Sequence, residues 1–309
     1  MGFIEVGTKN IGDAMYAADH NFEVETVPLV LPDGTKVPDK VATVRADNGA
    51  YLGTVGHGYQ VVQPVSFYEL AEEFISQTGA TIDKALTMKG GAVMGLSMTV
   101  NTREYLPGDP IDLNFLMMTS FNSQFSILGR ALSVRAFCLN QLPNSNALFD
   151  IKHTTFAEKR LDMAMRMIAF FGQEQKSFDG KMKMLTKYSM TDRDMVTWFR
   201  NLFPKPNPKA QTTRATSILE NKTAAYVKLL NEGRGVDVPG LKGTAYHALN
   251  ALTEYVNHER PTRVKDGRDP AEVKFESTVF GSGNQLMQKG FKSIIEMVKH
   301  EPSDKYISA

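Results

Sequence analysis

Strand-like and helix-like hydrophobic patterns are separated along this chain, and that separation restricts the possible folds more than any other feature. Between residues 41 and 139, apolar residues mostly follow the short alternating runs of β-strands. From Phe156 onward they mostly follow the 3.6-residue period of helices. Alternating β and α units would build a parallel sheet, whereas strands followed by helices indicate an antiparallel one. The predicted fold class is therefore α+β.

The strand-rich part is predicted to form a hairpin-rich sheet with one interposed helix. Turn signals separate three pairs of apolar runs, at 41–46 and 51–55, 80–88 and 92–100, and 111–119 and 125–139. Ser66 and Glu69 have the spacing of a capping box, and Gly79 would end the helix that they begin. A long helix from Phe156 to Phe171 follows the sheet, and the C-terminal half is expected to be helical.

The predicted organisation has five parts. Pro28, Pro32 and Pro38 interrupt the start of the chain, which is therefore expected to be loosely ordered. The parts are a loosely ordered segment at 1–40, an α+β core at 41–175, a basic helical segment at 176–240 with a Pro-rich linker at 204–208, C-terminal helices at 241–300, and a frayed tail at 301–309.

Composition excludes several classes of site. The single cysteine, Cys138, cannot form an internal disulfide or a cysteine-rich zinc site. Gly281-Ser282-Gly283 lacks the lysine and hydroxyl residue of a phosphate loop and is interpreted as a turn, so no cofactor is expected. The first residues contain no apolar leader, and no stretch approaches the roughly 18 apolar residues of a membrane span. A cytoplasmic protein of the host cell, without a membrane partner, is expected.

Charge is unevenly distributed although the net charge is only +1. Residues 1–150 hold 9 basic and 16 acidic side chains, whereas residues 151–240 hold 16 basic and 9 acidic ones. The basic middle can attract an anionic partner, or it can attract the acidic half of a second copy of the chain. Composition alone leaves both alternatives open.

Basic and aromatic residues gather where the strands give way to the long helix, and they are the candidate nucleic-acid-binding set. Cationic groups there would grip phosphates, and aromatic rings would stack on bases. The predicted cationic residues are Arg130, Arg135, Lys152, His153, Lys159, Arg160 and Arg166, and the predicted stacking residues are Phe121 and Phe125. The alternative is an ordinary solvated helix face paired with Glu158 and Asp162.

A second polar set lies on the predicted helix from Thr244 to His258. His247, Glu254 and His258 fall within roughly 20° of one line along it. They are interpreted as a polar interface, because metal ligands on one helix usually lie one turn apart. A metal-dependent enzyme using this face remains an alternative. No serine, histidine and acid set or paired-acid motif is recognisable, so the chain is predicted not to be an enzyme.

Several segments together resemble one family. They run from Arg45 to Gln63, from Arg135 to Asn140, from Ile151 to Thr154, from Gly243 to Arg260, and from Phe280 to Gly283. Their order and spacing resemble the phage/plasmid-like family described only as a domain of unknown function. The likeness spans about residues 40–295, with one departure at Gln141, where the family more often has threonine.

That resemblance implies a protein of phages, plasmids or other mobile elements. The expected order of strands and long helix is also similar to the core of single-strand annealing recombinases such as Red-beta, RecT and Erf. This second likeness is an analogy between folds. It implies rings or filaments that hold single-stranded DNA in a basic groove and need neither ATP nor a metal for annealing.

The leading hypothesis is therefore a phage- or plasmid-encoded protein that binds and anneals single-stranded DNA in homologous recombination. It would act as a homo-oligomer in which the acidic part of one subunit meets the basic part of the next. A phage exonuclease or a host single-strand-binding protein would be a further partner. The alternatives are an oligomeric assembly or regulatory protein that binds another protein, and the metal-dependent enzyme described above.

Overall fold

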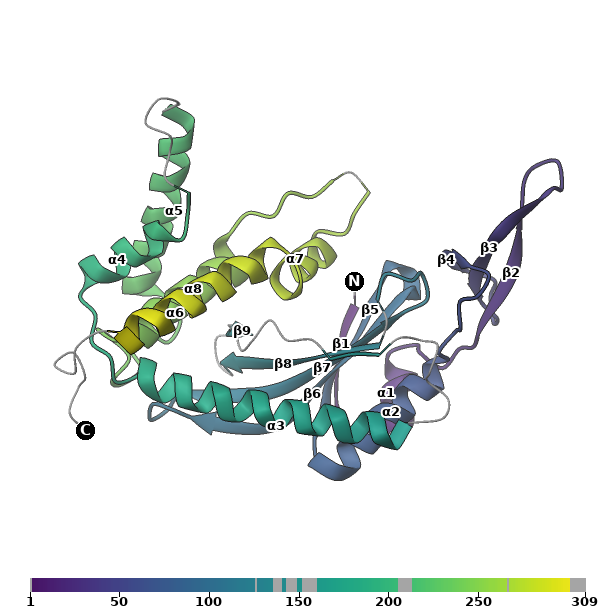
Figure 1. Ribbon diagram of the computed structural model, residues 1–309, viewed down its shortest axis with the longest axis horizontal. Coiled ribbons are helices and arrows are strands. Elements are labelled where there is room, and N and C mark those ends of the chain that lie inside the picture. The colour runs from purple at the N-terminus through teal and green to yellow at the C-terminus, as the bar shows by residue number, and fades with distance from the viewer. Residues whose placement is uncertain are drawn as a thin grey trace. The chain divides into compact units, whose positions relative to one another are not determined.

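Antiparallel sheets and a helical C-terminal half form the structure, which confirms the predicted α+β class (Figure 1). The structure is a computed structural model and describes residues 2–125, 127–135, 141–142, 149–151, 160–204, 213–265 and 267–300. The predicted tail and nearly all of the Pro-rich linker lie outside these residues.

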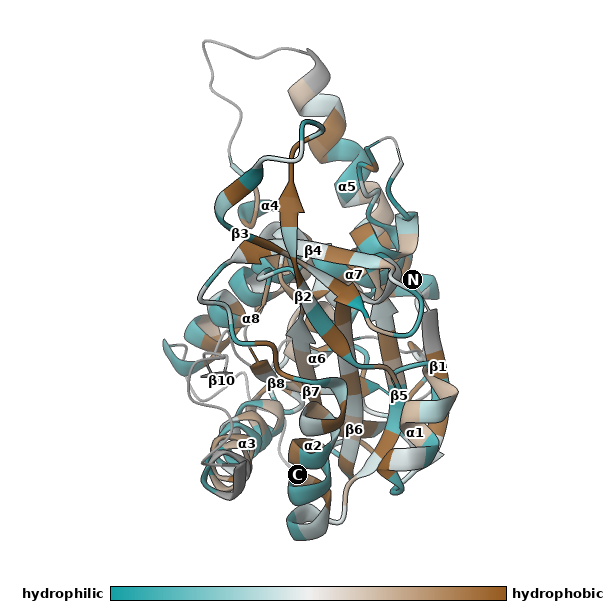
Figure 2. Ribbon diagram, turned by 90° about the vertical axis from the view of Figure 1, so that its right-hand side faces the viewer, coloured by the Kyte–Doolittle hydropathy of each residue, from teal (hydrophilic) through white to brown (hydrophobic). Residues whose placement is uncertain are grey.

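The larger sheet has the strand order β1-β5-β6-β7-β8-β10, and β9 pairs with β8. Its strands are β1 (Gly2–Thr8), β5 (Thr81–Met88), β6 (Val93–Glu104), β7 (Pro110–Ser120), β8 (Ile127–Arg135), β9 (Gln141–Leu142) and β10 (Phe149–Ile151). The register joins Met88 to Val93 at the turn between β5 and β6, so that predicted hairpin is confirmed. Hydrophobic bands recur along β5, β6 and β7 (Figure 2).

A smaller sheet consists of β2 (Val24–Val30), β3 (Lys36–Arg45) and β4 (Tyr51–Gly56), in that order. The predicted hairpin at the Asp47-Asn48-Gly49 turn is confirmed, because Val41 pairs with Val55 across β3 and β4. The first 40 residues, expected to be loosely ordered, form β1, α1 (Ile11–Ala17), β2 and the first part of β3. Pro28 is compatible with β2 because that strand pairs with β3 alone and lies at a sheet edge.

The helices after α1 are α2 (Pro64–Thr78), α3 (Arg160–Leu185), α4 (Asp192–Asn201), α5 (Thr213–Glu232), α6 (Ala245–Glu254), the π-helical turn η4 (Tyr255–Glu259), α7 (Pro270–Val279) and α8 (Ser282–His300). The expected cap at Ser66 is wrong: α2 begins earlier, with Gln63 at its N-cap. Gly79 ends α2 with a φ of 72°, as predicted. The long helix continues well past Phe171, because a mid-helix glycine such as Gly172 costs only about 1 kcal/mol.

The described chain forms two compact units. Unit 1 contains residues 1–101, 114–131 and 147–173, and unit 2 contains residues 102–113, 132–146 and 174–309. The predicted core boundary near residue 175 lies beside the change of unit after Gln173. Residues 102–113 and 132–146, which include the ends of β6 and β8 and the start of β7, thus belong to the same unit as the C-terminal helices. No sequence pattern predicted this grouping.

Unit 1 has an aromatic core. Phe74 of α2 stacks on Phe115 of β7 with 4.9 Å between ring centroids, and Phe171 of α3 meets both rings edge-on. Gly129 of β8 makes room for this cluster, because a Cβ atom there would lie 2.2 Å from the Phe115 ring. The Phe115 ring of β7 therefore contacts both α2 and α3 and helps to hold these helices on the sheet.

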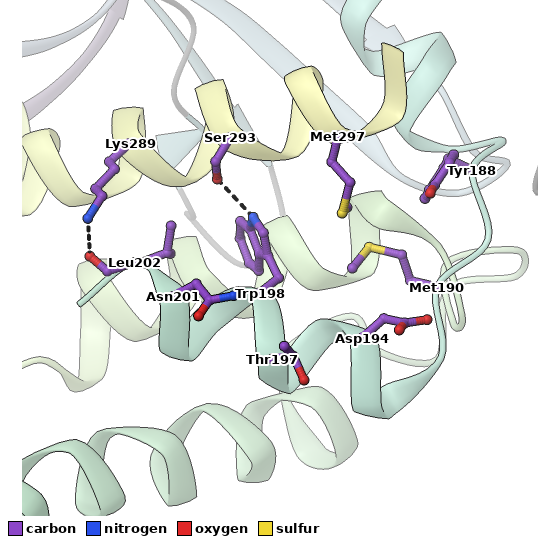
Figure 3. Close-up of a pocket in the computed structure, with 10 residues that line it drawn as sticks. All are labelled: Tyr188, Met190, Asp194, Thr197, Trp198, Asn201, Leu202, Lys289, Ser293 and Met297. Atoms are coloured by element: carbon purple, nitrogen blue, oxygen red, sulfur yellow. Dashed lines mark hydrogen bonds between the residues drawn. The ribbon is translucent and has the colours of Figure 1, made fainter. Parts of the chain in front are cut away.

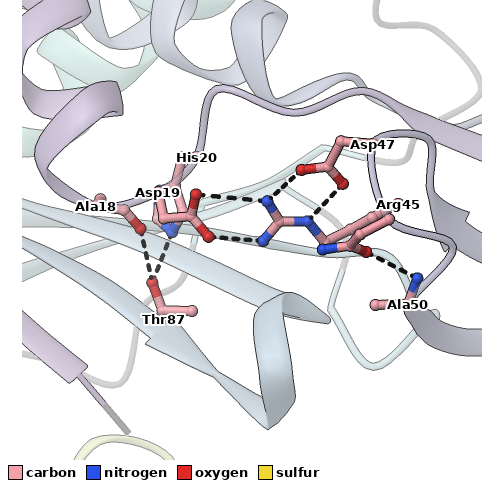
Figure 4. A network of polar contacts seen from close by, with 8 residues as sticks. Ala18, Asp19, His20, Arg45, Asp47, Ala50 and Thr87 are labelled. Carbon is pink, nitrogen blue, oxygen red and sulfur yellow. Dashed lines mark hydrogen bonds and ion pairs between the residues drawn. The ribbon is translucent and has the colours of Figure 1, made fainter.

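A polar network joins the small sheet of unit 1 to the segment after α1 (Figure 4). Arg45, whose side chain is mostly buried, pairs with Asp19 at 2.8 Å and with Asp47 at 2.7 Å, and its guanidinium lies 4.1 Å from the Phe22 ring centroid. The neighbouring His20 is fully buried. These contacts fix the chain between α1 and β2.

The two ring nitrogens of His20 fit a neutral imidazole. Thr87 donates its hydroxyl to Ala18 O, so it accepts the bond from Nε2 of His20 at 2.8 Å. Nδ1 then accepts from the Tyr68 hydroxyl at 2.8 Å. Burial lowers the pKa of His20 to about 4, while the charges of Asp19 and Arg45 act on that pKa in opposite directions.

Acidification is therefore expected to destabilise the protein through His20. The unfolded imidazole takes up a proton near pH 6.5 and the folded one only near pH 4, so the stability contribution is complete above pH 6.5 and is lost as pH falls toward 4. Between pH 7 and 5 the loss is about 2 kcal/mol, measurable from urea midpoints. The variant His20→Gln should lose much of this pH dependence, and an equal dependence in the variant would contradict the assignment.

Unit 2 is held by close packing of α6 against α8. Gly290 of α8 lies where a Cβ atom would be 2.2 Å from Leu252 Cδ2 and 3.3 Å from the Trp198 ring. Gly180 of α3, in contrast, has no such neighbour within 4 Å.

The same substitution should therefore have opposite effects at these two glycines. Gly290→Ala is expected to cost about 1–3 kcal/mol, because the added methyl overpacks the contact between helices. Gly180→Ala is expected to stabilise by roughly 0.5–1 kcal/mol through helix propensity. Urea denaturation measures both, and equal effects would show that α6 and α8 are not packed at Gly290.

Candidate anion-binding site

Arg135, predicted to contact nucleic acid, lies fully buried at the end of β8. Its Nε donates to Asp109 Oδ1 at 2.7 Å, and both side chains are inaccessible to solvent. The second oxygen of Asp109 accepts from the Tyr246 hydroxyl at 2.7 Å, and the Tyr246 ring lies beside the guanidinium. In this structure Arg135 and Asp109 form a buried ion pair that joins the strand ends of unit 2 to α6, rather than a surface for phosphates.

Two further residues of the predicted set are also in the interior. Arg130 is 3% exposed, and burial lowers its pKa to about 10. Phe121, expected to stack on bases, is fully buried with its ring edge-on to Phe22. Phe125 is partly exposed. We therefore leave Arg130, Arg135 and Phe121 out of the candidate surface.

The rest of the predicted cationic set is only partly described. Arg166 is exposed on α3 and pairs with Asp162 at 2.8 Å, which is the arrangement expected of a solvated helix face. Arg160 is the first residue of α3. Lys152, His153 and Lys159 lie outside the described residues, so their role stays a prediction.

His247 and Glu254, two members of the predicted polar interface, are each 4% exposed. His247 Nε2 bonds to Leu230 O at 2.9 Å, and both carboxylate oxygens of Glu254 accept from the Arg234 amide. This side of α6 thus packs on the end of α5 and the loop that follows it. His258 lies in η4 and is partly buried. In the described part of the chain, no group of three histidine, cysteine, aspartate or glutamate side chains is arranged to hold a metal.

A different cationic site lies where the chain leaves η4 and where α7 meets α8. The close junction of α7 and α8 at Gly281 sets its shape, because a Cβ atom on Gly283, in the first turn of α8, would lie 2.8 Å from Ser277 O. The helix α8 begins at Ser282, directly after Gly281. Unpaired amides at a helix start attract negative charge.

Arg260 is the central residue of this site. It follows η4, and its amide donates to Tyr255 O at 2.7 Å. Its Nη2 donates to Ser282 Oγ at 3.2 Å. Its Nη1 is buried and has no hydrogen-bond partner among the described residues. A buried guanidinium nitrogen without an acceptor is costly, so this atom is suited to an anion that supplies one.

Two lysines surround Arg260. Lys274 of α7 donates to Val256 O and Arg260 O, and Lys222 of α5 lies 4.4 Å from the Phe203 ring centroid. Burial is the main cause that lowers the pKa of each lysine, and the positive charge of Arg260 lowers it further. The three cations are therefore close enough to repel one another, and a bound anion would relieve that repulsion.

The site opens into a pocket of about 430 Å³. Its lining includes Arg260, Arg263, Thr262, Ser277 and Ser282, which offer two guanidinium groups and three hydroxyls. Glu276 is the one carboxylate among the lining residues, and its Oε2 accepts from Arg268 at 2.7 Å. Guanidinium and hydroxyl donors around a helix start are the donor set of phosphate-binding sites. We call this the Arg260 pocket.

Further lysines extend from the Arg260 pocket along α8. Lys289, Lys292 and Lys299 are exposed, and Glu296 is the exposed acidic residue of that helix. Lys299 also lies near Lys181 of α3, because its charge lowers the pKa of Lys181 after the larger effect of burial. The lysines of α8 give the Arg260 pocket a positive surface on one side.

Sequence reasoning missed the Arg260 pocket. Gly281-Ser282-Gly283 is only partly the expected turn, because Gly281 lies in the bend between α7 and α8 whereas Ser282 and Gly283 already belong to α8. The helix α7 before it is not predicted from sequence, so nothing placed this bend beside Arg260. A signal was present in Arg260-Pro261-Thr262-Arg263, which sets two arginines around a proline at a helix end.

Comparison with known proteins gives one match. A family model described as "Domain of unknown function (DUF932)" matches residues 51–278, which include Arg260, Arg263 and most of the pocket lining. No curated protein and no solved structure matches the chain significantly. Among the described helices, none combines the length and the apolar character that crossing a membrane requires.

Proposed function

We propose, for a chain that belongs to the family described as a domain of unknown function (DUF932), that it binds and anneals single-stranded DNA. The Arg260 pocket and the α8 lysines would hold the phosphates. No ATP is required, because base pairing supplies the energy of annealing. The proposal keeps the function expected from sequence and moves its phosphate contacts to unit 2.

One observation carries this proposal: Arg260 has a buried Nη1 without a partner, beside two lysines and a second arginine around an open pocket. Such a cluster is stabilised by an anion. Hydroxyl groups and a helix start complete the donor set for a phosphate oxygen.

A nucleic-acid strand with several phosphates would pair with more of the positive charge on this surface than an isolated anion would. Lys289, Lys292 and Lys299 continue the positive charge along α8, and a single anion in the pocket would leave them unused. A nucleic-acid strand that neutralises several of these groups releases its own counterions, which drives binding.

The charges of the two units also favour assembly between copies. Unit 1 holds 11 basic and 15 acidic residues, whereas unit 2 holds 24 basic and 19 acidic ones. An acidic unit 1 of one subunit meeting a basic unit 2 of the next gives a head-to-tail contact, which produces rings or filaments. We propose such an oligomer as the form that holds two strands for annealing.

Fluorescence anisotropy of a labelled single strand across a salt series tests the proposal. Tight binding is expected at about 50 mM salt and a loss of roughly 20-fold by about 200 mM, as for three neutralised phosphates. Mixing complementary strands then measures annealing. Absence of binding at low salt would reject the proposal, and binding without faster annealing would reject its annealing part.

A further inference from the structure

A second pocket of unit 2 lies between α4 and α8 and has a different chemistry (Figure 3). Its volume is about 350 Å³, and more of its exposed lining is apolar than polar. Trp198 lies in the middle of the lining, with Met190 and Met297 toward one end and Leu202 and Lys289 toward the other. We call this the Trp198 pocket.

The tryptophan in this pocket is held in place. Its indole N–H donates to Ser293 Oγ at 2.9 Å, and Ser293 in turn donates to Gly290 O at 2.9 Å. The close approach of α8 at Gly290 supports the indole from that side. Trp198 is 7% exposed, so a base in the pocket would contact the open part of a fixed aromatic ring whose polar atom is already bonded.

The rim of the pocket suits a neutral, planar, polar-edged group. Methionine sulfurs make favourable contacts with aromatic rings, and Met190 and Met297 both line the pocket. Asp194 and Asn201 place oxygen acceptors at the rim. The Asp194 carboxylate, whose Oδ2 accepts from Thr191 N and Oγ1, disfavours a phosphate there, and the Asn201 amide oxygen can accept from the amino group of a nucleobase.

The Trp198 pocket and the Arg260 pocket share one face of α8. At 3.6 residues per turn, Ser282 of the Arg260 pocket and Lys289 and Ser293 of the Trp198 pocket fall within about 40° of each other around the helix. At 1.5 Å per residue, Ser282 and Ser293 are roughly 16 Å apart along it. That distance corresponds to about five nucleotides at the stacked spacing of 3.4 Å, and to fewer in a stretched strand.

Lys289 lines the Trp198 pocket at the end that is nearer to Ser282 along α8. Its ammonium caps the end of α4 by donating to Leu202 O, and the side chain is exposed. A strand that leaves the Arg260 pocket along α8 thus meets a cation before it reaches Trp198.

We propose that the Trp198 pocket receives a base of the single strand whose phosphates lie in the Arg260 pocket, so that the chain binds unpaired bases and not merely a polyanion. This inference rests on the proposed function. It accounts for preference for single strands, because the bases of a duplex are stacked and paired and cannot enter the pocket.

Trp198 is the single tryptophan of the chain, so its fluorescence reports on this pocket alone. The test titrates the full-length protein with a strand of about 12 nucleotides and with an abasic strand of equal phosphate number. We expect the base-bearing strand to bind about tenfold more tightly and to change the Trp198 emission. The abasic strand should bind without changing the emission.

A variant with a filled pocket provides the second measurement. Thr197 is exposed and lines the pocket, so Thr197→Phe should lower the affinity for the base-bearing strand to that for the abasic strand. Ala224→Phe, at an exposed position of α5 away from the pocket, is the matched control and should bind as the original chain does.

The outcomes separate the two proposals. If both strands bind with equal affinity and the emission stays constant, the base pocket is rejected while phosphate binding stands. If neither strand binds at low salt, both are rejected. Emission changes produced equally by a tryptophan-free peptide rich in aromatic residues would assign the pocket to a protein partner and would overturn the nucleobase proposal.

Discussion

Replacing Arg135 with methionine is expected to destabilise the protein by about 3–5 kcal/mol, the largest single effect that we predict. The substitution keeps an extended side chain but leaves the carboxylate of Asp109 buried without its ion-pair partner. The Tyr246 hydroxyl would remain as one donor to that carboxylate and cannot neutralise its charge. Urea denaturation at neutral pH measures the change.

The control for this prediction is Arg166→Met, which breaks an exposed ion pair with Asp162 on α3 and should cost less than about 1 kcal/mol. A second variant that combines Arg135→Met with Asp109→Leu should recover part of the lost stability, because it removes the isolated charge. A fully stable Arg135→Met protein would show that this arginine is exposed, and it would return Arg135 to the list of phosphate contacts.

Replacing Arg260 and Arg263 together with alanine is expected to weaken binding of a single strand by about 100-fold or more at low salt. Hydrogen bonds to charged groups contribute about 1.5–3 kcal/mol each, and tenfold in affinity corresponds to about 1.4 kcal/mol. Neither arginine has a carboxylate partner among the described residues, so the fold should tolerate the change. Anisotropy titration measures the affinity, and a urea midpoint confirms that the variant is folded.

A matched control removes the same charge from the same unit. Arg193 and Arg200 are exposed on α4 and do not line the Arg260 pocket, so their joint replacement by alanine should weaken binding far less. Equal losses for the two double variants would indicate that only net charge matters, and they would remove any special role from the Arg260 pocket.

Much of the fold could be predicted because local signals agreed with packing. The turn at Asp47-Asn48-Gly49 and the helix stop at Gly79 each depend on backbone conformations that few residues adopt. The order of strands and then helices was also enough to predict an antiparallel sheet. Such signals lie within a few residues of the structure that they specify.

The site was harder to predict because burial depends on contacts distant in sequence. Arg135 appears in the sequence as a cation near aromatic residues, and only the approach of Asp109 and Tyr246 shows that its charge is neutralised inside unit 2. The same limit applies to Glu254, whose carboxylate accepts from the Arg234 amide across 20 residues of chain. Charge and spacing could identify candidate residues, but not which of them face solvent.

In the Arg260 pocket the opposite occurs: residues that the sequence did not single out come together as a site. Its parts come from α5, η4, α7 and the start of α8, and no sequence window contains them together. Each part alone has an ordinary structural role, such as Lys274 capping η4. The anion site is a property of their arrangement.

The most direct test of phosphate binding in the Arg260 pocket is the slope of log affinity against log salt for a single strand. Each phosphate contact contributes about 0.7 to that slope, so the original chain should have a slope steeper by about 1.4 than the Arg260→Ala and Arg263→Ala double variant. The Arg193 and Arg200 control should keep the original slope. Parallel lines for the original chain and the pocket variant would show that these two arginines contact no phosphate, and the account would be wrong.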